Sequence, residues 1–418
     1  MKKIQYIISL AMAVVLFPGA ALAGGAPDLA AEAVFLLDEG SGKVLYEKNA
    51  DLPMFPASTT KIMTALLLLE HAELNEIILV GEEIDWIGYD SSTAKLKVGN
   101  RLTAAEIIYA LLLPSGNDAA YTAAVFVARK ASGFELMDIG QALAVFAGMM
   151  NERARELGAR NTNFAVPDGY HTPEHVTTAR DLALITLEAR KHEFLCQAAA
   201  ATEYYWQGRR WTNTNRLLRL DYPEEYYPWA TGFKTGYTPE AGNCIVTTAS
   251  GGGRDLLAVI LNSPRYALWQ DARTLLEYGF QSWRRYEMLV AGRQVFTAPV
   301  RGQRQGEPET VVIVAGETYA DLFPAEDIAR IQLNFAWARG VTARGGAGLV
   351  FKAPIRKGQT LGTAVINLDG EVLGEVELLA GHGVKGFRWW LPVGGAAAVA
   401  IGLLALMKGR RGKRQAAA

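Results

Sequence analysis

The sequence predicts an α/β protein of the α+β kind, in which helices flank an antiparallel sheet and a small all-β domain and a C-terminal transmembrane helix follow. Strand-like runs lie at both ends of residues 28–285, with helical runs between them. Such an order favours a sheet covered by helices. From about residue 286, short Val- and Ile-rich runs alternate with Gly turns, and residues 389–407 carry no charge.

The composition allows two or three globular domains. The chain has 418 residues, of which 50% are hydrophobic and 20% charged, so it is too apolar to be disordered. Eight basic residues lie before position 24 or after position 387, and without them the chain carries 34 basic against 43 acidic residues, a net charge of −9. An acidic body without a basic stripe excludes nucleic acid as a partner.

Residues 1–23 are predicted to be a signal peptide. Lys2 and Lys3 precede the apolar run Ile7 to Phe17, and Ala21-Leu22-Ala23 then gives a small-residue cleavage pattern. An uncleaved membrane anchor is the alternative, but the run is short for a span. We expect cleavage after Ala23 and a mature chain outside the cytoplasm.

Residues 389–407 are predicted to be a single-pass membrane anchor. A helix over the 19 uncharged residues from Trp389 to Met407 would span about 28 Å, the thickness of a bilayer core. Trp389 and Trp390 suit an interfacial belt, and the basic residues of 408–418 suit a cytoplasmic tail. A helix lying in the membrane plane would need a polar face, which this segment lacks. We therefore expect an extracytoplasmic body tethered to the cell membrane.

The first domain, residues 28–285, is predicted to open with a hairpin over 31–49, turning at Asp38–Gly42. A helix is predicted from Ser58, its N-terminal cap, to Glu70, and its all-round hydrophobicity indicates a buried central position. Residues 85–101 read as short strands and turns. Periodicity predicts further helices at about 103–113, 118–130, 136–157 and 178–190.

The end of the first domain is predicted to be a second hairpin and a helix. Two β-rich runs between Asn243 and Asn262 flank Ser250–Gly253, and a helix follows from about 266 to 284. Residues 286–385 then form the small β-rich domain. The chain has only two cysteines, Cys196 and Cys244, which excludes a disulfide-rich scaffold and a cysteine zinc ribbon. We expect two buried free thiols.

The first chemical motif is Ser58-Thr59-Thr60-Lys61. Spacing three places the hydroxyl and the amine on one face of a helix, where a desolvated lysine can activate the serine. The motif alone is weak, because a helix cap and a surface lysine give the same pattern. Ser92 and Lys95 repeat the spacing in a strand-and-turn stretch, where it points to opposite faces.

Two further motifs change this interpretation. Ser115-Gly116-Asn117 lies between two predicted helices, where a loop can present a hydroxyl and a carboxamide into a cleft. Lys234-Thr235-Gly236 comes just before the predicted hairpin at 244–261, on an edge that could carry substrate. SxxK, SxN and KTG stand in the order of the penicillin-recognising serine enzymes.

On these motifs the chain resembles the serine-type D-alanyl-D-alanine carboxypeptidases, the low-molecular-mass penicillin-binding proteins. The resemblance covers about residues 28–385 and implies the penicillin-binding, β-lactamase-like transpeptidase fold. It extends to segments 55–64, 113–120, 167–169, 177–183 and 231–238. Two positions depart from the family: Asp168 stands where histidine is common, and Tyr237 where histidine is frequent. Because neither is a proton-transfer residue of the family, we expect activity to be retained.

The resemblance implies a role for each catalytic residue. Ser58 would attack the carbonyl between two terminal D-alanines, and Lys61 would take its proton. Ser115 would relay a proton to the leaving amine, and Asn117 would hold Lys61 and the substrate amide in register.

The resemblance also implies how the substrate is held. Lys234 and Thr235 would bind the terminal carboxylate, so that the enzyme acts as a carboxypeptidase on peptidoglycan pentapeptides and limits crosslinking of the cell wall. The backbone N–H groups of Ser58 and Tyr237 would form the oxyanion hole, and Gly236 would let the strand approach closely. β-Lactam antibiotics would be inhibitors.

No cofactor or metal is expected. The five histidines (His71, His171, His175, His192 and His382) show no metal-ligand spacing, and solvated or capping roles suit them better. Tyr204, Tyr205 and Trp206 read as core aromatics rather than as a substrate platform.

Three other functions compete with the carboxypeptidase hypothesis: a β-lactamase, a transpeptidase or endopeptidase acting on crosslinks, and a catalytically silent wall-binding scaffold. A silent scaffold would be expected to have lost Ser58 or Lys61, and both are present. In class A β-lactamases Asp lies between the Ser and Asn of the middle motif, and a glutamate clears the acyl-serine. Here position 116 is Gly, and no Glu is followed four residues later by Asn, the spacing of that glutamate.

Overall fold

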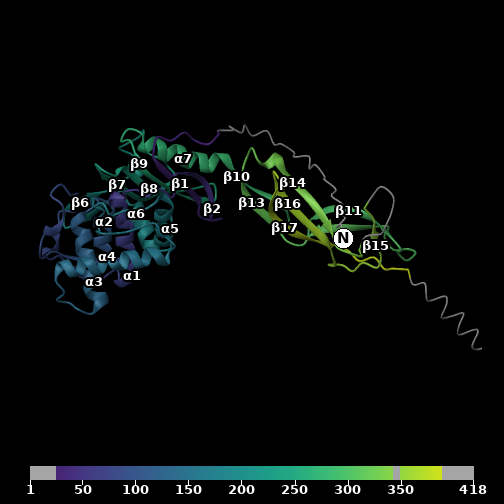
Figure 1. Cartoon of the computed structure of the whole chain (residues 1–418), viewed down its shortest axis with the longest axis horizontal. Coiled ribbons are helices and arrows are strands. Elements are labelled where there is room, and N and C mark those ends of the chain that lie inside the picture. The colour runs from purple at the N-terminus through teal and green to yellow at the C-terminus, as the bar shows by residue number, and fades with distance from the viewer. Residues whose placement is uncertain (1–24, 342–348, 388–418) are drawn as a thin grey trace, which may run out of the picture. The chain divides into compact units, whose positions relative to one another are not determined.

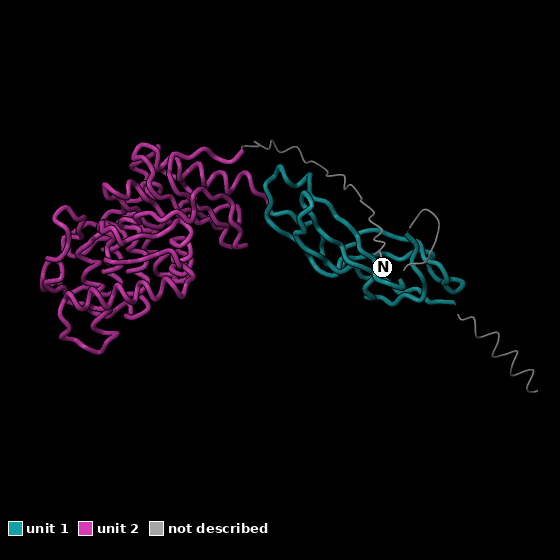
Figure 2. The backbone as a smooth tube through the Cα atoms, viewed as in Figure 1, with its two compact units in different colours: residues 1–19, 285–418 teal, residues 20–284 magenta. Residues whose placement is uncertain are grey.

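The computed structural model describes residues 25–341 and 349–387. They fall into two compact units, the first ending at Arg284 and the second beginning at Arg285 (Figure 2). Within the described ranges, no helix has both the length and the apolar character that a membrane crossing requires. The predicted signal peptide (1–23), membrane span (389–407) and basic tail (408–418) lie outside the described residues.

The first unit contains a five-stranded antiparallel sheet in the order β2-β1-β9-β8-β7. Its strands are β1 (Ala33–Asp38), β2 (Lys43–Lys48), β7 (Ala230–Thr238), β8 (Gly242–Gly251) and β9 (Arg254–Ser263). Both predicted hairpins are confirmed, as β1 with β2 and β8 with β9. The edge strand β7 contains the whole KTG motif, which the sequence placed just before the hairpin.

Seven α-helices are described in the first unit (Figure 1). They are α1 (Lys61–His71), α2 (Ala104–Leu112), α3 (Asn117–Ser132), α4 (Ile139–Glu156), α5 (Ala179–Arg190), α6 (Glu193–Ala200) and α7 (Leu268–Ser282). All but α6 were predicted, with ends that differ by up to three residues. Two small two-stranded sheets were not predicted as such: β3 (Ile77–Leu79) with β4 (Arg101–Thr103), and the hairpin of β5 (Glu203–Trp206) with β6 (Arg209–Thr212).

Helices cover both faces of the sheet. Because side chains alternate along a strand, Leu257 and Leu261 of β9 join the large core that contains α1, whereas Leu256 faces α7. A Cβ at Gly279 of α7 would lie 2.7 Å from Leu256 Cδ1, so this glycine allows close packing. The central position predicted for α1 is confirmed, since Leu66 and its neighbours are fully buried.

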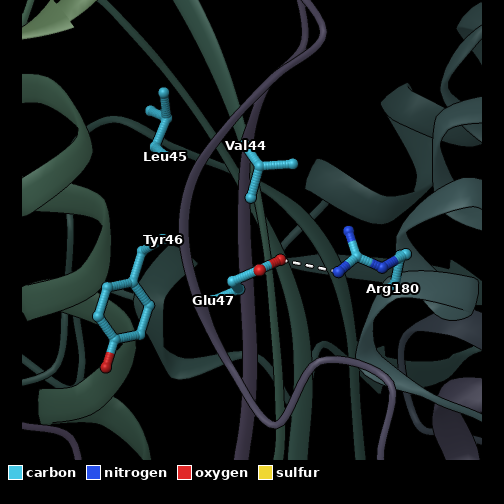
Figure 3. Close-up of a pocket in the computed structure, with 5 residues that line it drawn as sticks. All are labelled: Val44, Leu45, Tyr46, Glu47 and Arg180. Atoms are coloured by element: carbon cyan, nitrogen blue, oxygen red, sulfur yellow. Dashed lines mark hydrogen bonds and ion pairs between the residues drawn. The ribbon is translucent and has the colours of Figure 1, made fainter. Parts of the chain in front are cut away.

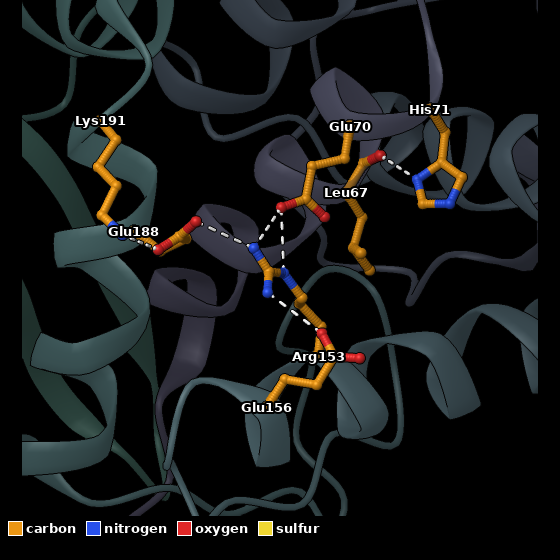
Figure 4. Close-up of polar contacts among 7 residues, drawn as sticks. All are labelled: Leu67, Glu70, His71, Arg153, Glu156, Glu188 and Lys191. Carbon is orange, nitrogen blue, oxygen red and sulfur yellow. Dashed lines mark hydrogen bonds and ion pairs between the residues drawn. The ribbon is translucent and has the colours of Figure 1, made fainter.

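One arginine joins three helices on the outer surface of the first unit (Figure 4). Arg153 of α4 donates to Glu70 of α1 at 2.8 Å and to Glu188 of α5 at 3.0 Å. His192 lies beside these two carboxylates, and the guanidinium supplies the positive charge between them. Partly exposed pairs of this kind contribute only about 0.2–1 kcal/mol each, so they orient the helices more than they stabilise them.

The aromatic cluster after α6 belongs mostly to the core. Tyr204 stacks on Tyr109 of α2 with ring centroids 4.2 Å apart, and Trp206 stacks on Trp211. Tyr205 on the same strand is 61% exposed, so the prediction of a core role is wrong for it. Alternation along β5 explains the difference. The two cysteines, Cys244 buried and Cys196 half-buried, are free thiols.

The second unit is an all-β domain, as predicted. Its strands are β10 (Trp283–Leu289), β11 (Gln294–Arg301), β12 (Thr310–Ala315), β13 (Tyr319–Pro324), β14 (Ile331–Trp337), β15 (Phe351–Lys352), β16 (Thr360–Leu368) and β17 (Glu371–Ala380). Six of them form a sheet in the order β14-β16-β17-β12-β11-β15, and β10 pairs with β13. A separate hydrophobic cluster, including Phe351 and Leu361, fills this unit.

Candidate active site

The predicted nucleophile lies in a tight turn rather than at a helix cap. Ser58 belongs to the 3-10 turn Ala57–Thr60, which leads directly into α1. The expectation that Ser58 caps the helix is wrong, because neither this turn nor α1 has a side-chain cap. The Ser58 hydroxyl instead accepts a hydrogen bond from the Lys61 amine at 2.9 Å. The spacing of three residues therefore brings the two groups into contact, as predicted.

Lys61 is fully buried and contacts three oxygen atoms. Its Nζ donates to Ser58 Oγ at 2.9 Å, to Asn117 Oδ1 at 2.7 Å and to the backbone carbonyl of Asp168 at 2.8 Å. Burial lowers the pKa of Lys61 to about 8, while the charges of Asp168 and Asp118 act in the opposite direction. A pKa near 8 leaves a useful fraction of neutral amine close to neutral pH, which a general base requires.

The Ser115–Asn117 loop is held by the segment that carries the second SxxK pattern. Ser115 is nearly buried and has a φ of +62°, a strained conformation of a kind that is common at functional sites. Ser92 Oγ donates to the Ser115 carbonyl at 2.7 Å, and Asn117 Nδ2 donates to Ser91 Oγ at 2.8 Å. Among the residues described, none hydrogen-bonds the Ser115 hydroxyl. The Ser92 hydroxyl thus supports the loop of Ser115.

Asp118 fixes the same segment from the first turn of α3. Its carboxylate accepts from the backbone N–H groups of Ala94 at 2.8 Å and Leu96 at 2.9 Å, and also from Ala119. These bonds keep residues 92–96 beside the loop. Ser92 and Lys95 lie in irregular backbone, so the short strands predicted within residues 85–101 are wrong, since only Arg101 belongs to a strand.

Edge strand β7 brings the third motif to the site. Lys234 is 1% exposed, and its Nζ donates to the Thr235 carbonyl at 2.8 Å. Burial lowers the pKa of Lys234 well below its usual value, and the charge of Lys61 lowers it further. The Thr235 hydroxyl bonds the Thr214 hydroxyl at 2.6 Å, while Tyr237 is 62% exposed.

Gly236 lies against the nucleophile turn. A Cβ at this position would come within 2.9 Å of the Ser58 backbone nitrogen and 3.0 Å of the Pro56 carbonyl oxygen. Real Cβ atoms essentially never approach so closely, so only glycine lets β7 pass here. Ser58 and the KTG strand are thereby held in backbone contact.

The ProAspGly segment clamps the start of α1 from another side. Gly169 has a φ of +82°, and a Cβ there would lie 1.9 Å from the Ala57 carbonyl oxygen. The Thr64 hydroxyl donates to the Pro167 carbonyl at 2.5 Å. The backbone of this segment also supplies the Asp168 carbonyl that accepts from Lys61. The position that departs from the family therefore contacts the proposed base directly.

His175 is a buried support of the same segment, so the expected solvated or capping role is wrong for this histidine. Its Nδ1 accepts from the Ala165 backbone N–H at 3.0 Å, and its Nε2 lies 2.8 Å from Thr60 Oγ1. Burial lowers the pKa of His175 to about 3, so the ring stays neutral. A neutral ring that accepts at Nδ1 donates at Nε2, so His175 donates to the Thr60 hydroxyl. This hydrogen bond links the loop of Ala165 to the turn that contains Ser58.

A hollow at the other edge of the sheet is separate from this chemistry (Figure 3). It is lined by residues 44–47 of β2 and by Arg180, which donates to Glu47 at 2.8 Å. Strand β2 lies at the opposite end of the strand order from β7. None of the predicted site residues lines this hollow.

Sequence reasoning did not predict the contacts that several residues make at the site. Asp168 and His175 lie in a loop whose contacts with α1 span about a hundred residues, and Thr214 meets Thr235 only through the fold. The ProAspGly triplet was the one available signal. It was singled out only because Asp168 departs from the family, and nothing in the sequence told what the loop would contact.

The fold and the site together define a serine enzyme of the acyl-transfer class. A hydroxyl, a buried amine beside it, an amide oxygen on that amine and a second buried lysine meet at the edge of an antiparallel sheet. Serine activated by a neighbouring base is the arrangement that forms acyl intermediates. No metal is needed for this chemistry.

Comparisons with known proteins agree with this class. Residues 20–265 match a family described as D-alanyl-D-alanine carboxypeptidase, and residues 283–386 match the C-terminal domain of penicillin-binding protein 5. The chain belongs to this D-alanyl-D-alanine carboxypeptidase family. It is 30% identical to the D-alanyl-D-alanine carboxypeptidase DacF of Bacillus subtilis, covering 85% of this chain and 86% of the relative. It is 28% identical to DacC of Escherichia coli, with 86% of each covered.

Solved structures resemble both units. Penicillin-binding protein 5 of Haemophilus influenzae matches 87% of this chain and 99% of its own, with a TM-score of 0.60 and 24% identity, and so shows the shared fold. A mutant of the Streptomyces K15 DD-transpeptidase matches 61% of this chain and 99% of its own, with a TM-score of 0.56 and 31% identity.

Replacing Gly169 should damage the site more than the fold. We expect Gly169→Ala to push the Ala57–Thr60 turn away and to slow serine acylation on the order of 100-fold, because small misplacements of reacting groups are costly. The control is Gly208→Ala, which has a similar φ of +78° but nothing within 4 Å of the added Cβ. It should cost about 1 kcal/mol of stability and leave acylation unchanged. Equal acylation rates for the two variants, measured with a fluorescent penicillin, would contradict the clamp.

Proposed function

We propose that this protein is a serine D-alanyl-D-alanine carboxypeptidase that removes the terminal D-alanine from peptidoglycan stem peptides ending in D-Ala-D-Ala. The observation that carries the proposal is the contact of 2.9 Å between Ser58 Oγ and the buried amine of Lys61, whose pKa is lowered to about 8. Family membership supports the same activity. Trimming this D-alanine limits crosslinking of the cell wall.

Acylation uses Ser58, Lys61 and Ser115. Neutral Lys61 takes the hydroxyl proton as Ser58 Oγ bonds to the carbonyl carbon between the two D-alanines. The bond from that carbon to the amide nitrogen then breaks, and Ser115 relays the proton from Lys61 to the leaving D-alanine amine, which returns Lys61 to its neutral form. The Asn117 carboxamide, 2.7 Å from Lys61 Nζ, keeps the amine oriented throughout.

Substrate binding uses strand β7. Lys234 and Thr235 hold the terminal carboxylate, which selects peptides with a free C-terminus. Binding an anion beside Lys234 also favours its protonated form, which burial otherwise disfavours. The oxyanion lies against the backbone N–H groups of Ser58 and Tyr237, and Gly236 allows this approach.

Water completes the cycle by hydrolysing the acyl-enzyme after D-alanine leaves. A β-lactam reacts with Ser58 in the same way, but its leaving group stays attached and hinders water. Gly116 stands where class A β-lactamases carry Asp, so a slow, penicillin-inhibited peptidase is favoured over a drug-clearing enzyme.

The direct test is mass spectrometry of a D-Ala-D-Ala-terminated peptide incubated with the protein. We expect loss of one D-alanine, and Ser58→Ala should abolish both this loss and labelling by a fluorescent penicillin. Ser92→Ala is the matched control, since Ser92 shares the motif but only supports the Ser115 loop. It should keep its label at a stability cost of about 1 kcal/mol. Labelling that survives Ser58→Ala would refute the assignment.

The role of Lys234 can be isolated with a pair of substrates. Lys234→Ala should lower kcat/KM for the free-carboxylate peptide roughly 10- to 100-fold, the effect of losing a charge-assisted hydrogen bond. The amidated peptide should be nearly unaffected. Equal losses on both peptides would make Lys234 a structural residue, and thermal melts of the variant would check its folding.

We also propose the chain organisation that the sequence indicates: a cleaved signal at 1–23, a catalytic domain over 28–285, a β domain over 286–385, and a membrane span at 389–407 with a cytoplasmic tail at 408–418. Its support is the charge pattern of the two termini. Expressed with its signal, a chain truncated after Gly386 should be secreted and keep activity on small peptides. Fractionation that finds this truncated chain still in the membrane would show a second anchor.

A further inference from the structure

The carboxyl group of Asp168 is fully buried and only half satisfied. One oxygen, Oδ1, accepts from the Tyr170 backbone N–H at 3.0 Å. The other, Oδ2, has no hydrogen-bond partner in the described part of the chain. An unpaired buried carboxylate oxygen is costly, so its retention calls for a reason.

The surroundings of this carboxyl group are those of the proposed base. The backbone carbonyl of Asp168 accepts from Lys61 Nζ at 2.8 Å, and the charge of Lys61 acts on the Asp168 side chain. A polar contact with the Asn117 amide also lowers the pKa of this carboxyl group. Asp118 also acts on Lys61, but its oxygens already accept three backbone N–H groups. Asp168 accepts one backbone N–H, from Tyr170, so its carboxylate is less fully engaged than that of Asp118.

We propose that Asp168 is a positioning residue that acts through Lys61, its buried carboxylate holding the proton on that amine and so setting the pH at which Ser58 can be acylated. The inference rests on the proposed function of Ser58 and Lys61. It assigns a role to a position where the family commonly carries histidine, which cannot supply a negative charge.

The electrostatic balance around Lys61 involves groups from three elements. Lys234 of β7 repels its charge, whereas Asp118 of α3 and Asp168 attract it. His175 stays neutral, and burial together with Asp168 raises the pKa of Tyr121 on α3. Burial raises the pKa of Asp168 itself, and Lys61 opposes this rise. The charges of Lys61, Lys234 and Asp168 therefore act on one another, and their protonation is coupled.

The direction of the effect follows from charge. Asp168 stabilises the protonated form of Lys61, so removing its charge lowers the pKa of the amine. Acylation needs the neutral amine, and its rate therefore rises with pH through that pKa. Loss of the Asp168 charge should move this rise to lower pH by about one unit, and below the rise it should make acylation roughly tenfold faster.

The experiment measures acylation of the full chain by a fluorescent penicillin from pH 5 to pH 10, by stopped flow. Asp168→Asn keeps the size of the side chain and an acceptor for Tyr170, but removes the charge. Its midpoint should lie about one pH unit below that of the unchanged protein. The control is Tyr170→Phe, on the same loop as Asp168. It removes the hydrogen bond that the Tyr170 hydroxyl donates to Asp90, and it leaves the buried charge of Asp168 in place. Its midpoint should not move.

Each other outcome has a definite meaning. A midpoint that stays fixed or rises in Asp168→Asn overturns the inference, since Asp168 would then carry no charge that Lys61 senses. A matching shift in Tyr170→Phe would assign the effect to loop geometry and also overturn it. If Asp168→Asn fails to fold, as judged by thermal melting, Asp168→His removes the same charge and should shift the midpoint in the same direction. An unchanged protein that takes no label at any pH would refute the proposed function instead.

Discussion

The burial of one ammonium group governs the arrangement of the catalytic unit. Lys61 lies inside the protein, where an unsolvated charge is expensive, and oxygens from the nucleophile turn, the start of α3 and the ProAspGly loop surround it. Three segments distant in sequence must therefore converge on one nitrogen atom. The remaining contacts, from His175 to the segment that Asp118 binds, keep these segments in place.

Elements that depend on local pattern were predictable from the sequence. Both hairpins, six helices of the catalytic unit and the all-β character of the second unit follow from periodicity and turn residues. Helix α6 and the hairpin after it were not predicted, because their short apolar runs fit several structures. Strand β7 was missed because glycines at 232 and 236 weaken a strand pattern, although tertiary contacts require them there.

The site divides in the same way. Motif residues such as Ser58 and Lys234 could be named from the sequence, because a hydroxyl or an amine at a characteristic spacing indicates a catalytic or binding role. Asp168 and His175 could not, because a buried partner is defined by what surrounds it in space. The second SxxK pattern shows the converse. Its serine donates a hydrogen bond to the Ser115 loop of the candidate site, so this motif, which lies in irregular backbone, is a structural support.

The glycines at 169 and 236 press on the nucleophile turn from two different segments, each without space for even a methyl group. The residue type at these two positions is therefore restricted to glycine. Any coding change at either position adds bulk against backbone atoms that cannot move without displacing Ser58. Substitution at either glycine would therefore change the geometry of the Ser58 turn itself. Tyr237, next to Gly236 on the same strand, is under no such restriction, because its side chain is exposed and a replacement there would meet solvent.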